Sequence, residues 1–140
     1  MRIFLDANIL FSAAKSDGAM RAFLDKLRVA GHALVVDGYV TGEARRNLES
    51  KFPKAISDFD SLLGTCEASD GVSWMLSDSL VTCLVEKDRP VLAAAIQHKC
   101  DVLMTGDKAH FGHLFGGHIQ GVAIYSPAGL ARQLDPHSAR

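Results

Sequence analysis

The stretch Cys100-Asp-Val-Leu-Met-Thr-Gly-Asp107-Lys-Ala-His-Phe111 decides how the rest of the chain is interpreted. Residues 102–104 are an apolar run that is too short for a helix and is bounded by turn-forming residues, which predicts a buried strand. A helix is predicted just before this strand, at residues 90–99. A helix followed by a buried strand indicates an α/β unit, and open α/β sheets bind ligands beyond the carboxyl ends of their strands. Asp107, which follows the carboxyl end of this strand, is therefore the first candidate site residue.

Composition and charge limit the class of protein. The chain has 140 residues, of which 48% are hydrophobic and 22% are charged, which is typical of a single globular domain. The net charge of −1 argues against a general nucleic-acid coat protein, so contact with nucleic acid would require a local patch or a bound metal. No signal peptide and no membrane-spanning run is found, and the three cysteines form no C-x-x-C pair. We expect a cytoplasmic protein without a membrane partner, whose thiols are reduced and buried: Cys66, Cys83 and Cys100.

Short apolar strands alternate with amphipathic helices along the chain. Further strands are predicted at residues 3–5, 33–36 and 122–125, with a weaker one at 72–75. Helices are predicted at residues 20–27, 40–48, 56–63, 80–85 and 127–134. Residues 8–12 are expected to form a loop or a short helical turn, and a loop rich in Gly and His is expected after residue 107. This order predicts a three-layer α/β/α sandwich with a central, mainly parallel sheet of four to five strands. Residues 1–134 are expected to form one domain, and residues 135–140 a C-terminal tail.

Four acidic residues are predicted to meet at one edge of this sheet. Asp6 and Asp107 both follow strands, and the carboxyl ends of parallel strands share one edge. Asp88 lies where the N-cap of the following helix belongs, at the same edge. Glu43 lies one turn into the helix that follows the strand at residues 33–36. Each acid also has a simpler interpretation, as a helix cap, a turn residue or a solvated side chain.

A cluster of carboxylates favours a bound divalent cation. Like charges a few ångströms apart raise one another's pKa, and a cation removes this cost. Oxygen ligands favour hard ions such as Mg²⁺ or Mn²⁺, which also bind phosphate oxygens. Such ions activate water and stabilise the leaving oxygen in phosphodiester hydrolysis.

The same residues resemble the PIN-domain family of ribonucleases, which includes the VapC-type toxins of bacterial toxin–antitoxin pairs. The matching stretches are Phe4-Leu-Asp6-Ala-Asn8, Thr41-Gly-Glu43, Glu86-Lys-Asp88-Arg-Pro-Val-Leu-Ala-Ala-Ala-Ile96 and Asp101-Val-Leu-Met-Thr-Gly-Asp107-Lys-Ala-His-Phe111. The resemblance implies a PIN-like sandwich and metal-dependent cleavage of RNA. It assigns the catalytic, metal-binding role to Asp6, Glu43, Asp88 and Asp107, and a supporting role to Asn8 and Thr105. It also implies an antitoxin that occludes the site, and a homodimer.

Basic and imidazole side chains give a second set of candidates. Arg45, Arg46 and Lys108 are expected to contact substrate, although a charged outer helix face explains the arginines equally well. Lys51 and Lys54 belong to the same predicted patch. His110, His113 and His118 include an H-x-x-H pair, but no further residue of the loop completes a tetrahedral zinc site. A solvated loop is the simpler interpretation of these histidines.

The sequence leaves three functions open. The first is a Mg²⁺- or Mn²⁺-dependent endoribonuclease that acts as the toxin of a toxin–antitoxin pair. The second is a non-catalytic module with the same fold that binds RNA or protein. The third is a phosphatase with Asp6 as nucleophile. Phosphatases of the haloacid-dehalogenase type have a second aspartate two residues later, where this chain has Asn8.

Overall fold

A six-stranded sheet forms the centre of the molecule in the computed structural model, which describes residues 1–69 and 89–135. Its strands, in spatial order, are β3 (Glu67–Ser69), β2 (Ala33–Asp37), β1 (Arg2–Leu5), β4 (Val102–Met104), β6 (Val122–Tyr125) and β5 (His118–Ile119). All neighbouring strands are parallel except β5 and β6. The mainly parallel sheet is confirmed, and the short strands β3 and β5 bring it to six strands. The strand predicted at residues 72–75 and the helix predicted at 80–85 lie outside the described residues.

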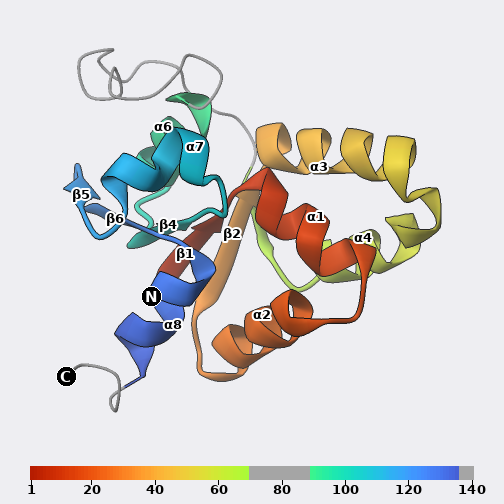
Figure 1. Ribbon diagram of the computed structural model, residues 1–140, viewed down its shortest axis with the longest axis horizontal. Helices are drawn as coiled ribbons and strands as arrows, with labels where there is room; N and C mark the ends of the chain where they lie inside the picture. The colour runs from red at the N-terminus through yellow and green to blue at the C-terminus, as the bar shows by residue number, and fades with distance from the viewer. Residues whose placement is uncertain (70–88, 136–140) are drawn as a thin grey trace.

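Helices cover both sides of the sheet, as predicted for a three-layer sandwich (Figure 1). One group is α1 (Ala7–Lys15), α2 (Ala19–Val29), α3 (Gly38–Lys51) and α4 (Ile56–Leu63), with the short 3₁₀ helix η1 (Pro53–Ala55) between α3 and α4. The other side carries α6 (Arg89–Gln97) and α7 (Lys108–Phe111), followed by the 3₁₀ helix η3 (Gly112–Leu114), and α8 (Pro127–Leu134) packs on β6. None of the helices within the described ranges has the length and apolar character needed to cross a membrane.

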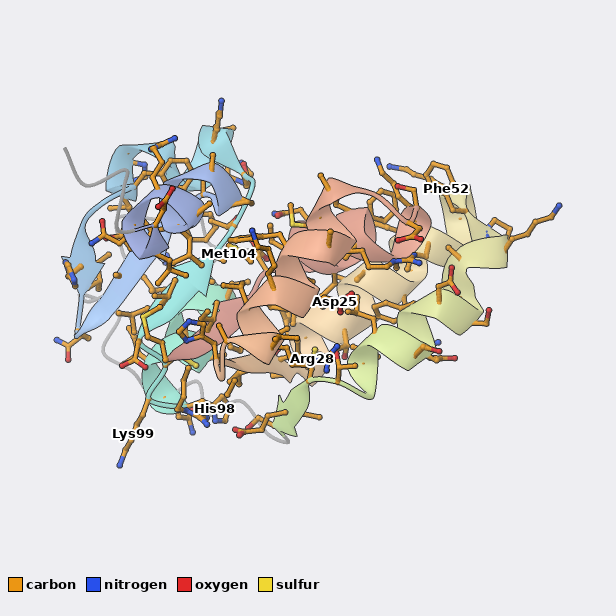
Figure 2. All side chains as sticks on the ribbon, turned by 90° about the horizontal axis from the view of Figure 1, so that it is seen from below. Asp25, Arg28, Phe52, His98, Lys99 and Met104 are labelled. Carbon is orange, nitrogen blue, oxygen red and sulfur yellow. The ribbon has the colours of Figure 1, made fainter. Side chains whose placement is uncertain are left out.

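The core lies where the central strands are covered on both faces. Ile3, Phe4 and Leu5 of β1 and Leu103 and Met104 of β4 are fully buried. Met104 lies between the two groups of helices (Figure 2). A strand buried on both faces has apolar side chains at successive positions rather than at alternate ones, which is the pattern of these runs.

Two segments contain more helix than expected, one predicted as a loop or a short helical turn and the other as a loop. Residues 8–12 belong to α1, because the Asp6 side chain accepts a hydrogen bond from the Ala7 amide and so caps the helix. The predicted Gly- and His-rich loop begins with α7, which Asp107 caps in the same way. The C-terminal helix α8 begins as predicted, with Ser126 as its N-cap and Pro127 in its first turn. Residues 136–140 of the predicted tail lie outside the described part of the chain.

Two of the predicted buried thiols can be located. Cys100 is buried, and burial raises the pKa of its thiol to about 11. Cys66 is half-buried, and burial also raises the pKa of its thiol. Both are free cysteines that are protonated at neutral pH, whereas Cys83 lies outside the described residues.

Asp37 at the end of β2 is a buried acid with one unpaired oxygen. Its Oδ1 caps α3 by accepting a hydrogen bond of 3.1 Å from the Val40 amide. Its Oδ2 is buried and has no hydrogen-bond partner in residues 1–69 or 89–135. Burial raises the pKa of the Asp37 carboxyl. The raised pKa makes stability depend on pH at this residue.

Asp37→Asn is expected to change how stability varies with pH. A pKa raised by folding stabilises the protein most below the unfolded-state pKa, and this contribution is lost as the pH rises through the folded-state pKa. The wild type should therefore lose stability relative to Asp37→Asn as the pH is raised above about 4, through the raised pKa of Asp37. Urea unfolding at a series of pH values measures this difference, with the exposed Asp25→Asn as control. A difference between wild type and Asp37→Asn that stays constant with pH would contradict the argument.

Candidate active site

The candidate acids at positions 6 and 107 lie side by side because their strands are neighbours. β1 pairs with β4 in parallel register, Leu5 opposite Met104, and the Asp6 amide donates to the Met104 carbonyl at 3.1 Å. From β1 the chain first adds β2 and β3 on one side and later adds β4 and β6 on the other. Such a reversal of strand order opens a crevice at the carboxyl ends of the two strands. Asp6 and Asp107 follow the two strands that flank this crevice.

Asp6 is a buried acid, with only 5% of its surface exposed, and its carboxylate accepts three hydrogen bonds. Its Oδ1 accepts from the Ala7 amide at 2.8 Å. Its Oδ2 accepts from the Thr105 hydroxyl at 2.8 Å and from the Asn8 side-chain amide at 3.2 Å. These donors stabilise a negative charge and fix the direction in which the carboxylate points.

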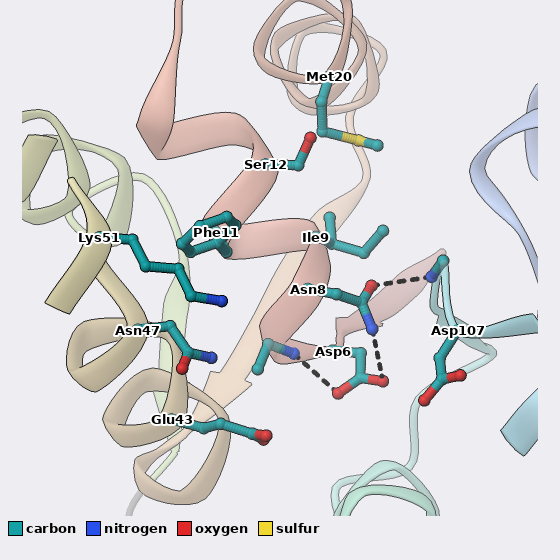
Figure 3. A pocket seen from close by; sticks show the side chains of 12 residues that line it. Asp6, Asn8, Ile9, Phe11, Ser12, Met20, Glu43, Asn47, Lys51 and Asp107 are labelled. Carbon is teal, nitrogen blue, oxygen red and sulfur yellow. Dashed lines mark hydrogen bonds between the residues drawn. The ribbon is translucent and has the colours of Figure 1, made fainter. Parts of the chain in front are cut away.

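Asn8 and Thr105 connect the segments that carry the two acids. The Asn8 Oδ1 accepts from the Gly106 amide at 2.8 Å (Figure 3), and the Asn8 Nδ2 lies 3.3 Å from the Thr105 Oγ1. The Thr105 hydroxyl, which is completely buried, also accepts from the Asp107 amide at 3.1 Å. The two residues that were predicted to support the site therefore bond to Asp6 and to the backbone around Asp107.

The Asp107 side chain contacts His110, which the sequence did not indicate. Its Oδ1 accepts from the His110 backbone amide at 3.1 Å, and its Oδ2 lies 2.8 Å from the His110 Nδ1. The His110 backbone amide therefore helps to orient this carboxylate, and the imidazole lies beside it. His113 and His118 are exposed. The described residues contain no group of three His, Cys, Asp or Glu side chains placed to hold a metal ion, and this applies to the acids of the site as well as to the histidines.

A cleft of about 470 Å³ lies in front of the acids. Asp6, Asp107 and Glu43 all line it, and Figure 3 shows the Glu43 carboxylate reaching into it from α3, across from the other two. The three acids therefore face a shared space and do not converge on a single point. The fourth predicted acid, Asp88, lies outside the described residues, next to the start of α6.

Other polar residues of the cleft come from the same face of α3 as Glu43. Asn47 and Lys51 follow Glu43 at intervals of four residues, so the helix places all three on one side, and all three line the cleft. Asn47 was not among the predicted site residues, and Lys51 was considered only as part of a basic patch. Their spacing from Glu43 is the sequence signal that would have identified both.

The residues predicted to contact substrate lie outside the lining of the cleft. Arg45 donates to the Asp60 carboxylate of α4 at 2.7 Å, and its guanidinium lies 5.0 Å from the centre of the Phe59 ring. Arg46 is exposed on α3, and Lys108 is exposed in the first turn of α7. Of the basic residues considered from the sequence, Lys51 is the one that lines the cleft together with the acids in the described part of the chain.

Comparison with known proteins gives matches to solved structures only. No family model and no curated protein matches the sequence. One match is VapBC2 from Rickettsia felis, which was solved bound to a DNA fragment from its promoter. It has a TM-score of 0.69 at 16% identity, and the match covers 90% of this chain and 98% of that chain. VapC20 from Mycobacterium tuberculosis, described as a sarcin-ricin loop cleaving toxin, has a TM-score of 0.59 at 14% identity over 84% and 97% of the two chains. VapBC-1 from nontypeable Haemophilus influenzae has a TM-score of 0.57 at 13% identity over 91% and 99%. The matches span nearly the whole of each chain, and the protein has the VapC-type PIN-domain fold.

Proposed function

We propose that this protein is a divalent-metal-dependent endoribonuclease that acts as the toxin of a toxin–antitoxin pair. The observation that carries the proposal is the shared cleft, which Asp6, Glu43 and Asp107 line from separate segments of the chain. The cleft is lined by three carboxylates and fewer basic side chains, so a bound cation would balance the negative charge. Lys51 is the one Lys or Arg among the cleft's lining residues in the described part of the chain.

The donor set fits Mg²⁺ or Mn²⁺. Asp6, Glu43 and Asp107, together with the predicted Asp88, would offer oxygen ligands, and such ions typically keep several waters beside one or two carboxylates. Carboxylates arranged around a space rather than at a point suit an ion that is partly hydrated. When bound, the ion would activate water and stabilise charge on the phosphate oxygens. The protein itself orients Asp6 through Asn8 and Thr105, orients Asp107 through His110, and presents the Lys51 ammonium to an anionic substrate.

A cleavage assay tests the proposed function. Single-stranded RNA labelled at one end is incubated with the protein and Mn²⁺, Mg²⁺ or EDTA, and the product lengths are resolved on a gel. Internal cuts with either metal and none with EDTA are expected. RNA binding without any cleavage in Mn²⁺ or Mg²⁺ would favour the non-catalytic module instead.

Thr105→Val is expected to weaken Mn²⁺ binding about 10- to 100-fold, as is typical when a group that orients a metal ligand is lost. The substitution keeps the volume of the side chain but removes the hydroxyl that donates to Asp6 and accepts from the Asp107 amide. Isothermal titration calorimetry with Mn²⁺ measures the effect. Thr65→Val is the matched control, because the exposed Thr65 hydroxyl donates to the Leu62 carbonyl at the end of α4 and does not line the cleft. Wild-type Mn²⁺ affinity in Thr105→Val would contradict the proposed role.

The proposal includes partners that remain to be tested. It predicts an antitoxin that covers the cleft, a homodimeric state and activity in the cytoplasm. Size-exclusion chromatography with light scattering measures the oligomeric state. Inhibition of RNA cleavage by the protein encoded beside this gene would test the antitoxin.

A further inference from the structure

An exposed basic surface adjoins the acidic cleft. It is formed by the C-terminal ends of α1 and α3 and by η1, and we call it the lysine–phenylalanine surface; its residues are Phe11, Lys15, Lys51, Phe52 and Lys54. It encloses a hollow of about 350 Å³. Lys51 lines both this hollow and the acidic cleft, so the two are adjacent.

The charge of this surface is opposite to that of the cleft. Lys15, Lys51 and Lys54 line the hollow, and Asp58 is the one acid among the lining residues that the structure describes. The Asp58 carboxylate lies 3.4 Å from the Arg21 guanidinium, which offsets its charge. None of the three ammonium groups forms an ion pair with a carboxylate of residues 1–69 or 89–135. A polyanion next to the cleft would therefore meet uncompensated positive charge.

An aromatic ring is exposed at the same place. Phe52 is 44% exposed, and it lies at the outer end of the helical group α1 to α4 (Figure 2). Its ring contacts the edge of Phe11, with 5.7 Å between ring centroids and 63° between ring planes. The Lys15 and Lys51 ammonium groups lie 5.6 and 5.9 Å from the centre of the Phe11 ring. Lysines and aromatic rings are thus interleaved, which is the composition of surfaces that bind single-stranded nucleic acid.

We propose that the lysine–phenylalanine surface binds the single-stranded RNA that flanks the cleaved bond, and this inference rests on the proposed ribonuclease function. The lysines contact the phosphates next to the cleft, and one base stacks on Phe52. Every nucleotide carries a phosphate and a base, so a strand leaving the cleft past Lys51 meets both kinds of partner in succession. An acidic protein segment would match the charges but would not account for the exposed ring.

Fluorescence anisotropy with a labelled single-stranded RNA of mixed sequence, in EDTA so that the RNA stays intact, tests this surface. Phe52→Ala is expected to weaken binding about 5- to 100-fold, the loss of one stacked base. Lys54→Gln is expected to reduce the slope of log affinity against log salt by about 0.7, the loss of one phosphate contact on a single strand. Val29→Ala and Lys26→Gln, both exposed on α2, are the matched controls and should bind as the wild type does.

Further measurements separate stacking from misfolding. Phe52→Trp should keep or increase affinity, because the larger ring stacks at least as well, whereas a purely structural role of Phe52 would make it no better than Phe52→Ala. Wild-type RNA binding by both Phe52→Ala and Lys54→Gln would overturn the inference. Absence of RNA binding by the wild type would also overturn it, as would lysine-dependent binding of a poly-glutamate peptide in place of RNA.

The two proposals fail in different ways. Absence of RNA cleavage in Mn²⁺, combined with the expected binding losses, would refute the nuclease and support the surface. Cleavage by the wild type, combined with unchanged binding and cleavage in Phe52→Ala and Lys54→Gln, would refute the surface and support the nuclease.

Discussion

Asp6→Asn is expected to slow RNA cleavage on the order of 100- to 1,000-fold, the loss typical of removing one group that stabilises charge in a transition state. The substitution keeps the size of the side chain and removes its charge. Asp6 is the acid that the protein holds most firmly, with three donors aimed at its two oxygens. A residue fixed in this way contributes to the reaction through the position of its charge, which an amide cannot replace.

Rates of RNA cleavage in Mn²⁺ under single-turnover conditions measure this effect. Asp25→Asn is the control, because Asp25 is an exposed acid of α2 whose partner is Arg28, one turn later. The introduced amide leaves one of the Asp6 donors without an acceptor, at a cost of about 1–3 kcal/mol, so thermal unfolding must show that the variant is folded at the assay temperature. Asp107→Asn, at a half-buried site, gives a second test with less risk to folding. Equal cleavage by wild type and both variants would remove the acids from the mechanism.

Phe4→Ala is expected to lower the free energy of unfolding by about 3–5 kcal/mol. Phe4 is fully buried in β1, where it pairs with Val35 of β2 and Leu103 of β4. Truncation leaves a cavity that these strands cannot close without breaking their register. Because the total stability of a domain is about 5–15 kcal/mol, this single change can remove a large part of it.

Urea unfolding followed by circular dichroism measures the loss. Val29→Ala is the control, since Val29 is 81% exposed at the end of α2 and its truncation should change stability by about 0.5 kcal/mol or less. A loss below about 1 kcal/mol in Phe4→Ala would mean that β1 is not the centre of the core.

The sequence was sufficient to predict the central strands and to predict that Asp6 and Asp107 follow strands that end at the same edge of the sheet. Each central strand contains a run of successive apolar residues, because it is buried on both faces, and each run is followed at once by a polar residue. Parallel strands then place the following side chains at one edge. The two acids lie side by side at that edge as long as β1 and β4 are neighbours, and these strands do pair in parallel.

The features that the sequence did not reveal depend on contacts that form only in the folded chain. β3 is a strand because Glu67 to Ser69 pairs with β2, and nothing in Glu-Ala-Ser itself favours a strand. Helix α1 was expected only as a loop or a short helical turn, because its start depends on the Asp6 cap and Asp6 was considered as a metal ligand rather than as a cap. The contact of His110 with Asp107 requires the turn of α7, which is only four residues long. Lys51 lines the cleft because α3 extends as far as Lys51 and keeps it on the same face as Glu43. Arg45 lies on another face of α3 and bonds to Asp60 of α4.

The short outer strands of the sheet affect how copies of this protein behave when crowded together. In the described part of the chain, β3 contributes three residues and β5 two, so each border of the sheet presents only a brief row of backbone groups. A long, flat border would offer a template on which further molecules could add as strands, the first step toward fibrils. The borders formed by β3 and β5 are short, so they offer few backbone groups for such growth.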